Sequence, residues 1–333
     1  MAKRIWMTVF MLLLTGGIAA CSTGSDETAP MEFLEQDIQI PFAADGTEYR
    51  IDGVLTLPKG VEKPAVAILV QGSGQSDYNE SIGENYPFRD LAWGLAENGI
   101  ATIRFNKRYY QYPQLAADEI TIQDEVLDDA AAAILLAGSL DSVDSERIYI
   151  IGHSLGGMLA PEIARCNPAI KGFVSLAGSP RSLADIMMDQ NEDALARMTE
   201  LSEMDRNINL AYIAQMVEQA KAAKPGDTGT ILGVPLGYWA SLNAIDTPSI
   251  VRELTIPMLF LQGGDDFQVK AATDFTEWKE LLEGSSLAGF IEYEGLSHLF
   301  MPSHGQFDLT EYDIAETMEP QVIRDIADWI QAH

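Results

Sequence analysis

Short runs of apolar, often β-branched residues alternate with helical patterns along most of this 333-residue chain. Alternation of this kind predicts an α/β protein, in which a mostly parallel sheet has helices on both faces. Ligands bind such sheets beyond the carboxyl ends of the strands, so a site is expected in the loops at that edge. The strand pattern occupies residues 64–70, 100–105, 147–151, 170–176, 257–262 and 290–293, and the helical pattern occupies residues 87–97, 121–137, 155–165, 270–282 and 320–331.

One long segment interrupts this alternation. Residues 180–250 contain no strong strand pattern, but they contain two helical stretches, at about 182–202 and 206–223. An insertion between two strands either covers the site or packs on the outside of the domain. We expect a helical cap, because flexible methionine side chains suit an adaptable apolar lining. Five methionines are concentrated there, namely Met187, Met188, Met198, Met204 and Met216.

The charge of the chain excludes one class of partner. The formal net charge is −29, and a nucleic-acid-binding surface needs lysine and arginine to replace the counterions of the phosphates. The same charge disfavours electrostatic binding to anionic lipid. It is typical of a soluble, self-repelling surface, with a preference for neutral or cationic substrates as the alternative.

The first 21 residues have the pattern of an export signal. Lys3 and Arg4 precede an apolar run, residues 5–20, that is short for a membrane span. The run ends in Ile18-Ala19-Ala20-Cys21, which resembles the lipobox of bacterial lipoprotein signal peptides. The resemblance implies that Cys21 becomes the first mature residue and carries lipid, so that the protein is exported and held at the cell membrane, facing outside the cytoplasm. An ordinary secretory signal is the alternative.

Residues 22–35 are polar and contain proline, so we expect a flexible tether before the folded domain of residues 36–333. That domain is expected to begin with an antiparallel pair of strands, at residues 38–42 and 50–57. Cys166 is the only cysteine besides Cys21, so no disulfide within the mature chain is expected. Its place just after a predicted helix favours a small core residue over a nucleophile.

The stretch Gly152-His153-Ser154-Leu155-Gly156 follows the predicted strand "RIYII" and begins a predicted helix. A G-x-S-x-G pattern in this context is typical of a nucleophile elbow, a sharp turn that exposes the serine hydroxyl at the edge of the sheet. Larger side chains at the glycines would collide with the turn and with neighbouring strands. Ser154 is therefore the candidate nucleophile, and the N–H of Leu155, at the start of the helix, is a candidate oxyanion donor.

A serine nucleophile needs a general base, and the chain has four histidines. His153 adjoins Ser154 and is expected to point away from it, His304 lies in a sequence typical of surface loops, and His333 is the last residue. His298 follows the last predicted strand, where a loop reaches the carboxyl edge of the sheet. We therefore expect His298 to be the base.

The base needs an acid to orient it, and the strand at residues 257–262 ends in Gly263-Gly264-Asp265-Asp266. Two adjacent carboxylates cannot both orient one imidazole, and burial of both would raise the pKa of one. The spacing to Val269 favours Asp266, and Asp265 is the alternative. The order Ser154, Asp266, His298 along the chain is that of the α/β-hydrolase triad.

These motifs identify a resemblance to the serine α/β-hydrolases, in the neighbourhood of bacterial esterases, dienelactone hydrolases and acyl-aminopeptidases. "GHSLGGM" resembles the nucleophile elbow of that group, "GGDDFQV" its acid loop and "YEGLSHLFM" its histidine loop. The similarity extends from Val66 to Met301 and is weakest over residues 180–250. It implies an α/β-hydrolase fold with a helical cap.

The resemblance also gives a role to "QGSGQSDYNESIG", which follows the strand at 64–70. In the family the loop after this strand supplies a backbone N–H to the oxyanion, which implies Ser73 as the second donor beside Leu155. The family usually has a histidine where this chain has Gln71, so the loop is expected to be held differently. The neighbouring segment Asn106-Lys107-Arg108-Tyr109-Tyr110 either shapes the pocket or forms a solvated loop.

The function implied is hydrolysis of a small-molecule carboxylic ester through an acyl-enzyme. The alternatives are a serine peptidase for short peptides or an acyltransferase on the same triad, and a lipid-anchored binding protein without activity. No metal or organic cofactor is expected, because the sequence shows no metal-ligand spacing and "QGSGQS" lacks the lysine of a phosphate-binding loop.

Overall fold

The computed structural model describes residues 33–44, 46–116 and 120–333. The expected signal peptide and Cys21 therefore lie outside the described residues. Within them the main strands are β1 (Phe33–Ala44), β2 (Thr47–Pro58), β3 (Val66–Val70), β4 (Ala101–Phe105), β5 (Ile148–His153), β6 (Ile170–Leu176), β9 (Met258–Gly263) and β10 (Ala288–Tyr293).

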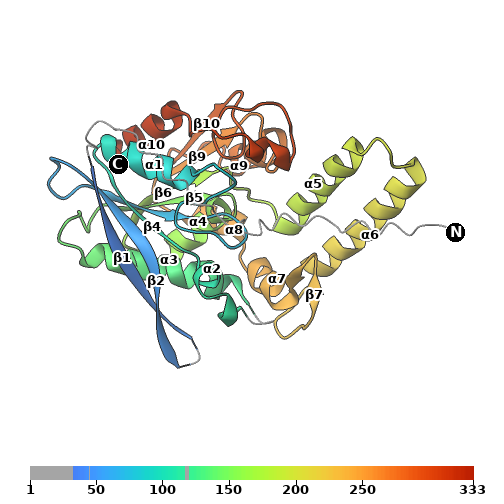
Figure 1. Cartoon of the computed structure of the whole chain (residues 1–333), viewed down its shortest axis with the longest axis horizontal. Coiled ribbons are helices and arrows are strands. Elements are labelled where there is room, and N and C mark those ends of the chain that lie inside the picture. The colour runs from blue at the N-terminus through green and yellow to red at the C-terminus, as the bar shows by residue number, and fades with distance from the viewer. Residues whose placement is uncertain (1–32, 45, 117–119) are drawn as a thin grey trace.

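These eight strands form one sheet in the order β1-β2-β4-β3-β5-β6-β9-β10 (Figure 1). β1 pairs antiparallel with β2, and β2 antiparallel with β4, whereas all the other neighbours are parallel. Helices connect successive parallel strands, as the strand–helix alternation predicts. The α/β-hydrolase fold with a mostly parallel sheet is therefore confirmed.

Helices cover both faces of the sheet. Neighbouring residues of a buried strand point to opposite faces, so each strand packs against both layers of helices. Ala67 and Leu69 of β3 pack toward α1 and α10, whereas Val66, Ile68 and Val70 pack toward α3 and α4. The helices of the sheet layers are α1 (Pro87–Glu97), α3 (Asp128–Ser139), α4 (Leu155–Cys166), α8 (Thr247–Glu253), α9 (Thr276–Leu281) and α10 (Pro320–Ala332); the short α2 (Arg108–Gln111) follows β4. π-Helical turns at Gln123–Leu127 and Ala271–Phe275 precede α3 and α9.

The tether expected over residues 22–35 ends earlier than the sequence suggests. Phe33, Leu34 and Glu35 already belong to β1 and pair with Pro58, Leu57 and Thr56 of β2. Phe33 is buried against Trp93, and the Glu35 carboxylate accepts a hydrogen bond from the Trp93 indole. This stretch is polar because most of its side chains are on the exposed face of an edge strand. Sequence periodicity alone does not distinguish such a strand from a linker.

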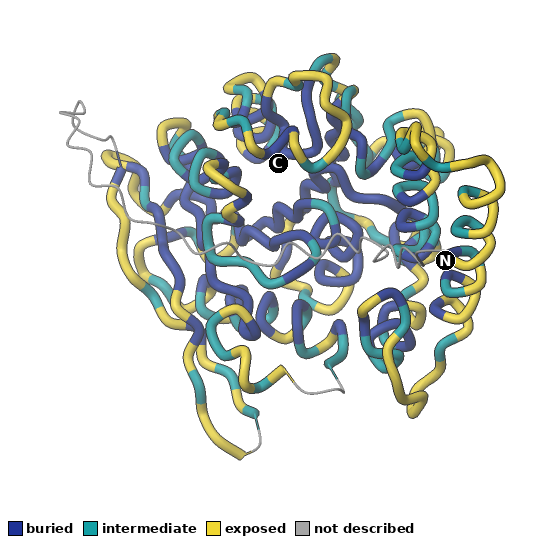
Figure 2. Tube along the Cα trace, turned by 45° about the vertical axis from the view of Figure 1, so that its right-hand side comes forward, coloured by how far each residue is buried: buried dark blue, intermediate teal, exposed yellow. Residues whose placement is uncertain are grey.

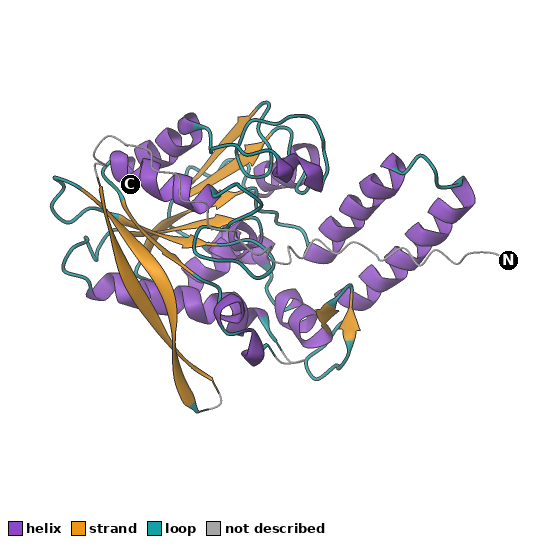
Figure 3. Cartoon of the chain, viewed as in Figure 1, coloured by secondary structure: helices purple, strands orange, loops and turns teal. Residues whose placement is uncertain are grey.

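The insertion between β6 and β9 contains α5 (Leu183–Arg197), α6 (Glu203–Lys221), α7 (Leu236–Asn243) and the two-residue strands β7 (Thr230–Ile231) and β8 (Val234–Pro235). The sequence predicted α5 and α6, but it predicted neither α7 nor α8. α5 and α6 form a hairpin that extends away from the sheet (Figures 1 and 3). Figure 2 shows that exposed and half-buried residues predominate on these two helices, in contrast to the strands.

The prediction that Cys166 is a small core residue is wrong. It is the last residue of α4 and is exposed, with its thiol 3.4 Å from the Glu162 carboxylate. Ile163 and Ala164 of the preceding turn are buried, whereas Arg165 and Cys166 at the end of the helix are exposed. None of the helices in the described part of the chain is long and apolar enough to cross a membrane.

Candidate active site

Ser154 lies in a sharp turn between β5 and α4. Its φ of +52° and ψ of −115° are strained for a residue with a side chain, as expected of a nucleophile elbow. The flanking glycines are required by space: a Cβ at Gly152 would lie 2.1 Å from the Gly156 carbonyl oxygen, and one at Gly156 would lie 2.1 Å from that of Val70. The sequence interpretation of "GHSLG" therefore has a direct steric basis.

The loops after β9 and β10 bring Asp266 and His298 together. Oδ2 of Asp266 lies 2.7 Å from Nδ1 of His298, and both residues are buried. Oδ1 of the same carboxylate accepts hydrogen bonds from the N–H groups of Gln268 (2.8 Å) and Val269 (2.9 Å). Asp265 is half-buried, and its side chain makes no such contact in the described part of the chain. Of the two candidate acids, Asp266 is therefore the one placed to orient His298.

The peptides on both sides of Gly72 are held by hydrogen bonds. The N–H of Gly72 donates to Oε1 of Glu80 (2.6 Å), and its C=O accepts from Nζ of Lys107 (2.5 Å). Because C=O and N–H of one trans peptide point in opposite directions, the hold on the Gly72 carbonyl aims the N–H of Ser73 away from Lys107. No acceptor among the described residues takes the N–H of Ser73 or of Leu155, so both remain available to an oxyanion.

Gln71 fixes the start of the same loop. Its side chain is buried, and its amide nitrogen donates to the carbonyl oxygens of Phe105 and Asp77. Gln71 thus connects the end of β3 to the end of β4 and to the loop that follows β3. The residue that departs from the family pattern is a structural anchor of the loop.

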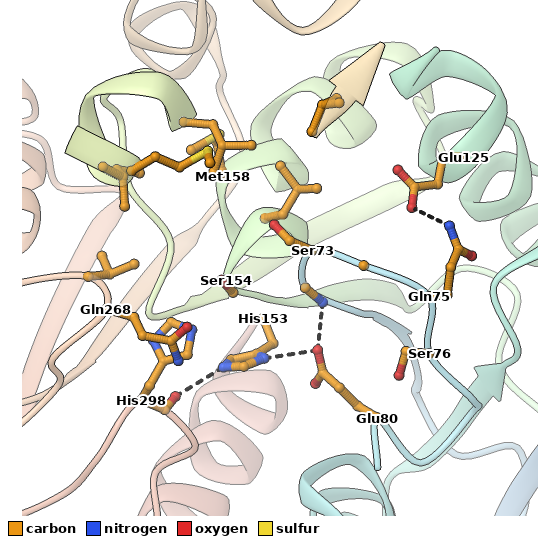
Figure 4. A pocket seen from close by; sticks show the side chains of 18 of the residues that line it. Ser73, Gln75, Ser76, Glu80, Glu125, His153, Ser154, Met158, Gln268 and His298 are labelled. Atoms are coloured by element: carbon orange, nitrogen blue, oxygen red, sulfur yellow. Dashed lines mark hydrogen bonds and ion pairs between the residues drawn. The ribbon is translucent and has the colours of Figure 1, made fainter. Parts of the chain in front are cut away.

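A cavity of about 480 Å³ lies over Ser154, and the sheet loops and the insertion line opposite sides of it (Figure 4). Ser73, His298 and Met158 contribute from the sheet side. The insertion contributes mainly apolar side chains, namely Leu183, Ile186 and Met187 of α5, Val234 and Pro235 of β8, and Tyr238 of α7. Of the five methionines in the insertion, only Met187 lines the cavity.

One part of the wall is polar. Glu125, from the π-helical turn before α3, lines the cavity near Gln75, and its carboxylate lies 3.5 Å from the Lys107 ammonium. Burial and the neighbouring Glu125 carboxylate raise the pKa of Tyr238 well above its usual value, so this phenol stays neutral at physiological pH. The Glu125 carboxylate at this end of the cavity is therefore paired with Lys107 behind the wall.

Sequence reasoning missed Glu80 and Glu125, and it left the role of Lys107 open. Lys107 and Arg108 are buried, so the solvated-loop alternative for this segment is wrong. Acidic and basic residues are seldom fully buried unless paired, and here the partners are distant in sequence, as with Arg108 and Asp129. The remaining candidate histidines lie apart from this site: His304 and His333 are exposed. Among residues 33–44, 46–116 and 120–333, no three His, Cys, Asp or Glu side chains are grouped so that they could hold a metal ion.

Comparisons with known proteins agree with this arrangement. Residues 68–307 match the model of the alpha/beta hydrolase family. The chain is similar to esterase EstD of Thermotoga maritima, with 32% identity over 92% of this chain and 69% of that protein. Two solved structures share the fold at low identity: Est1E from Butyrivibrio proteoclasticus (18% identity, TM-score 0.54, 89% of this chain and 99% of that one) and an esterase of Pyrococcus furiosus (15%, 0.54, 93% and 96%).

The family match covers most of the chain, and it includes the elbow, the acid loop and the histidine loop described above. The similarity to EstD extends over nearly the whole chain, the insertion included. The chain belongs to the alpha/beta hydrolase family, and it is a hydrolase of the esterase type.

Proposed function

We propose that this enzyme hydrolyses small carboxylic esters with an apolar acyl or alcohol group, through an acyl-enzyme on Ser154, Asp266 and His298. The observation that carries the proposal is the convergence of Ser154, His298 and two unpaired N–H groups on one cavity, with Asp266 hydrogen-bonded to the histidine at 2.7 Å. The apolar side chains of the insertion support an apolar substrate group, because they offer it few polar partners.

The chemistry follows from the roles of these groups. His298 takes the proton of the Ser154 hydroxyl as the serine oxygen attacks the ester carbonyl carbon. The carbonyl oxygen becomes an oxyanion that accepts hydrogen bonds from the N–H groups of Ser73 and Leu155. Collapse of this intermediate breaks the bond to the alcohol, which receives the proton from His298 and leaves. Water then attacks the acyl-enzyme with His298 as base again, and the acid is released.

The test is hydrolysis of p-nitrophenyl butyrate by the purified protein. We expect turnover by the wild type and a loss of at least about 10⁴-fold in Ser154→Ala, with an unchanged circular dichroism spectrum. Ser139→Ala, at an exposed serine of α3, is the control and should keep the activity. Full turnover by Ser154→Ala would show that another group is the nucleophile. Faster cleavage of aminoacyl anilides than of esters would identify a peptidase, and acyl transfer to added alcohols in preference to water would identify an acyltransferase.

We also propose that the enzyme is exported and anchored at the cell membrane through lipid on Cys21, with residues 22–32 between the lipid and β1. The support is the sequence pattern of residues 1–21, which lie outside the described residues. Labelling of cells with a fatty acid should mark the wild type and Cys166→Ser but not Cys21→Ser. Equal labelling of Cys21→Ser would show that the anchor is not there.

A further inference from the structure

His153, the residue before the nucleophile, has a hydrogen-bond acceptor at each ring nitrogen. Nε2 lies 3.0 Å from the backbone carbonyl oxygen of His298, and Nδ1 lies 3.0 Å from Oε1 of Glu80 (Figure 4). A carbonyl oxygen can only accept, so Nε2 must carry a proton. The imidazole is buried, with 4% of the residue exposed.

The second nitrogen faces a carboxylate that is already accepting. Oε1 of Glu80 also accepts the N–H of Gly72, at 2.6 Å. Oε2 of Glu80 is buried and has no partner, so a proton placed there would have no acceptor. One proton is shared between Oε1 and Nδ1, and it belongs on the imidazole because imidazole is the stronger base of the two groups. This leaves an ionised Glu80 beside a His153 protonated at both nitrogens.

Electrostatics agree with this count of protons. Burial alone would lower the pKa of His153, but the charge and hydrogen bond of Glu80, with the carbonyl of His298, raise it above its usual value. Glu80 reaches this position at a cost, since its φ of +53° lies in the left-handed region that glutamate rarely adopts. Strain of this kind is characteristic of residues that are held for function.

The pair connects the two halves of the site. Glu80 holds the Gly72 peptide, next to the donor N–H of Ser73, and His153 holds the backbone of His298. The two imidazole rings lie side by side, with their centroids 4.7 Å apart. A Cβ at Gly72 would lie 3.0 Å from the Cβ of Ser154 and 3.2 Å from Oε1 of Glu80, so the loop, the elbow and the pair are in close contact.

We propose that Glu80 and a protonated His153 form a buried ion pair that positions the oxyanion loop and the His298 loop, and whose positive end opposes protonation of His298. Both members are positioning residues. The effect on His298 rests on the proposed function, in which that residue is the base, whereas the charge state of His153 does not.

The charges around His298 give the direction of the effect. Asp266, from the β9 loop, favours the protonated base, and His153, from the elbow, opposes it. Glu80 lies behind His153, so the positive end of the pair is the nearer one, and Tyr312, whose hydroxyl accepts a hydrogen bond from the Gln268 side chain, is a neutral group beside Asp266. Loss of the positive charge on His153 should therefore move the acid limb of activity to higher pH.

The charge state is tested by proton-detected ¹⁵N spectra of the histidine side chains in the full chain. We expect the wild-type His153 ring, assigned by its loss in His153→Gln, to show the doubly protonated pattern from pH 6 to 8. In Glu80→Gln it should titrate within that range, because the amide carries no negative charge. A singly protonated His153 in the wild type at pH 7 would overturn the proposal, whatever the variants do.

Activity tests the positioning role. Glu80→Gln should lower kcat for p-nitrophenyl butyrate by about 10-fold or more and change KM little. His153→Gln removes the positive charge and keeps Glu80, so it should shift the acid limb of kcat/KM upward by about half a pH unit to one unit. Glu84→Gln, an exposed glutamate of the same loop, is the matched control and should leave both unchanged. An unshifted acid limb in a folded His153→Gln would overturn the effect on His298. If His153→Gln does not fold, His153→Asn serves for the same measurement, and the wild-type spectra still decide the charge state. A wild type without esterase activity would refute the proposed function alone, because the spectra do not depend on turnover.

Discussion

On the sheet side of the cavity, the Asp266 carboxylate accepts four hydrogen bonds, from Gln262, Gln268, Val269 and His298. On the insertion side, the walls are apolar side chains of α5, β8 and α7, and the next helix outward leaves Met204, Ile208 and Tyr212 exposed. The sheet side thus presents directional hydrogen-bonding groups to the cavity, whereas the insertion side presents mostly apolar side chains, whose contacts with a substrate are non-directional. We therefore expect changes on the first side to act on the chemical step and changes on the second to act on the choice of substrate.

The largest effect should come from the most constrained group. Asp266→Asn should lower kcat by about 10⁴-fold, because the amide no longer holds His298 in the tautomer that accepts the serine proton. Steady-state hydrolysis of p-nitrophenyl butyrate measures this, and Asp265→Asn is the matched control, with a loss below about 3-fold expected from its lack of contact with the base. A greater loss at Asp265 would reverse the acid assignment.

A smaller effect on kcat is expected at Lys107, which holds the oxyanion loop through the Gly72 carbonyl. Lys107→Met removes the donor to the Gly72 carbonyl and should lower kcat by about 10- to 100-fold, less than the loss of an oxyanion donor itself. KM should change little, since Lys107 is buried away from the substrate.

Lys107→Met also leaves the Glu125 carboxylate without its cation. This effect must be distinguished from the loss of the hydrogen bond to the Gly72 carbonyl. The double variant Lys107→Met/Glu125→Gln removes that charge, and it should remain impaired in kcat. Recovery of wild-type kcat in the double variant would show that the buried charge, and not the loop, caused the defect. Lys171→Met, at an exposed lysine, is the control for the loss of a surface charge.

On the insertion side, changes should act on selectivity rather than on the chemical step. Met187→Ala enlarges the cavity and should change the ratio of kcat/KM for octanoate over acetate esters by about 10-fold, as one or two methylenes do in an apolar pocket. The exposed Met204→Ala should leave that ratio unchanged. A loss of kcat on every ester in Met187→Ala would contradict the division between the two walls.

The smallest effect is expected on the outer face of α6. Met204→Gln should change the free energy of unfolding by less than about 0.5 kcal/mol, because the side chain is 73% exposed. Denaturant titration measures this, and the selectivity for acyl chains should stay the same. A large loss of stability would show that this face is covered in solution.

The parts that were predictable from sequence are those set by local order along the chain. The elbow at Ser154, the acid loop at Asp266 and the loop of His298 each follow a strand of the parallel part of the sheet, and parallel strands bring their carboxyl ends to one edge. The roles of Glu80 and Lys107 depend on pairing across many residues, such as Glu80 with His153, which no local pattern contains. The same limit explains the error at Phe33, where pairing with β2 decides between strand and tether, and at Cys166, where the end of α4 relative to the sheet decides burial.

The elbow glycines have a consequence for how this gene can vary. A methyl group at position 152 or 156 would come within 2.1 Å of a backbone oxygen that has no room to retreat. Every change at the first or second base of a glycine codon replaces the residue, so every such change at these two codons introduces that overlap. Selection should therefore remove nearly all coding variation there, while the codons for the outer face of α6 remain free to drift.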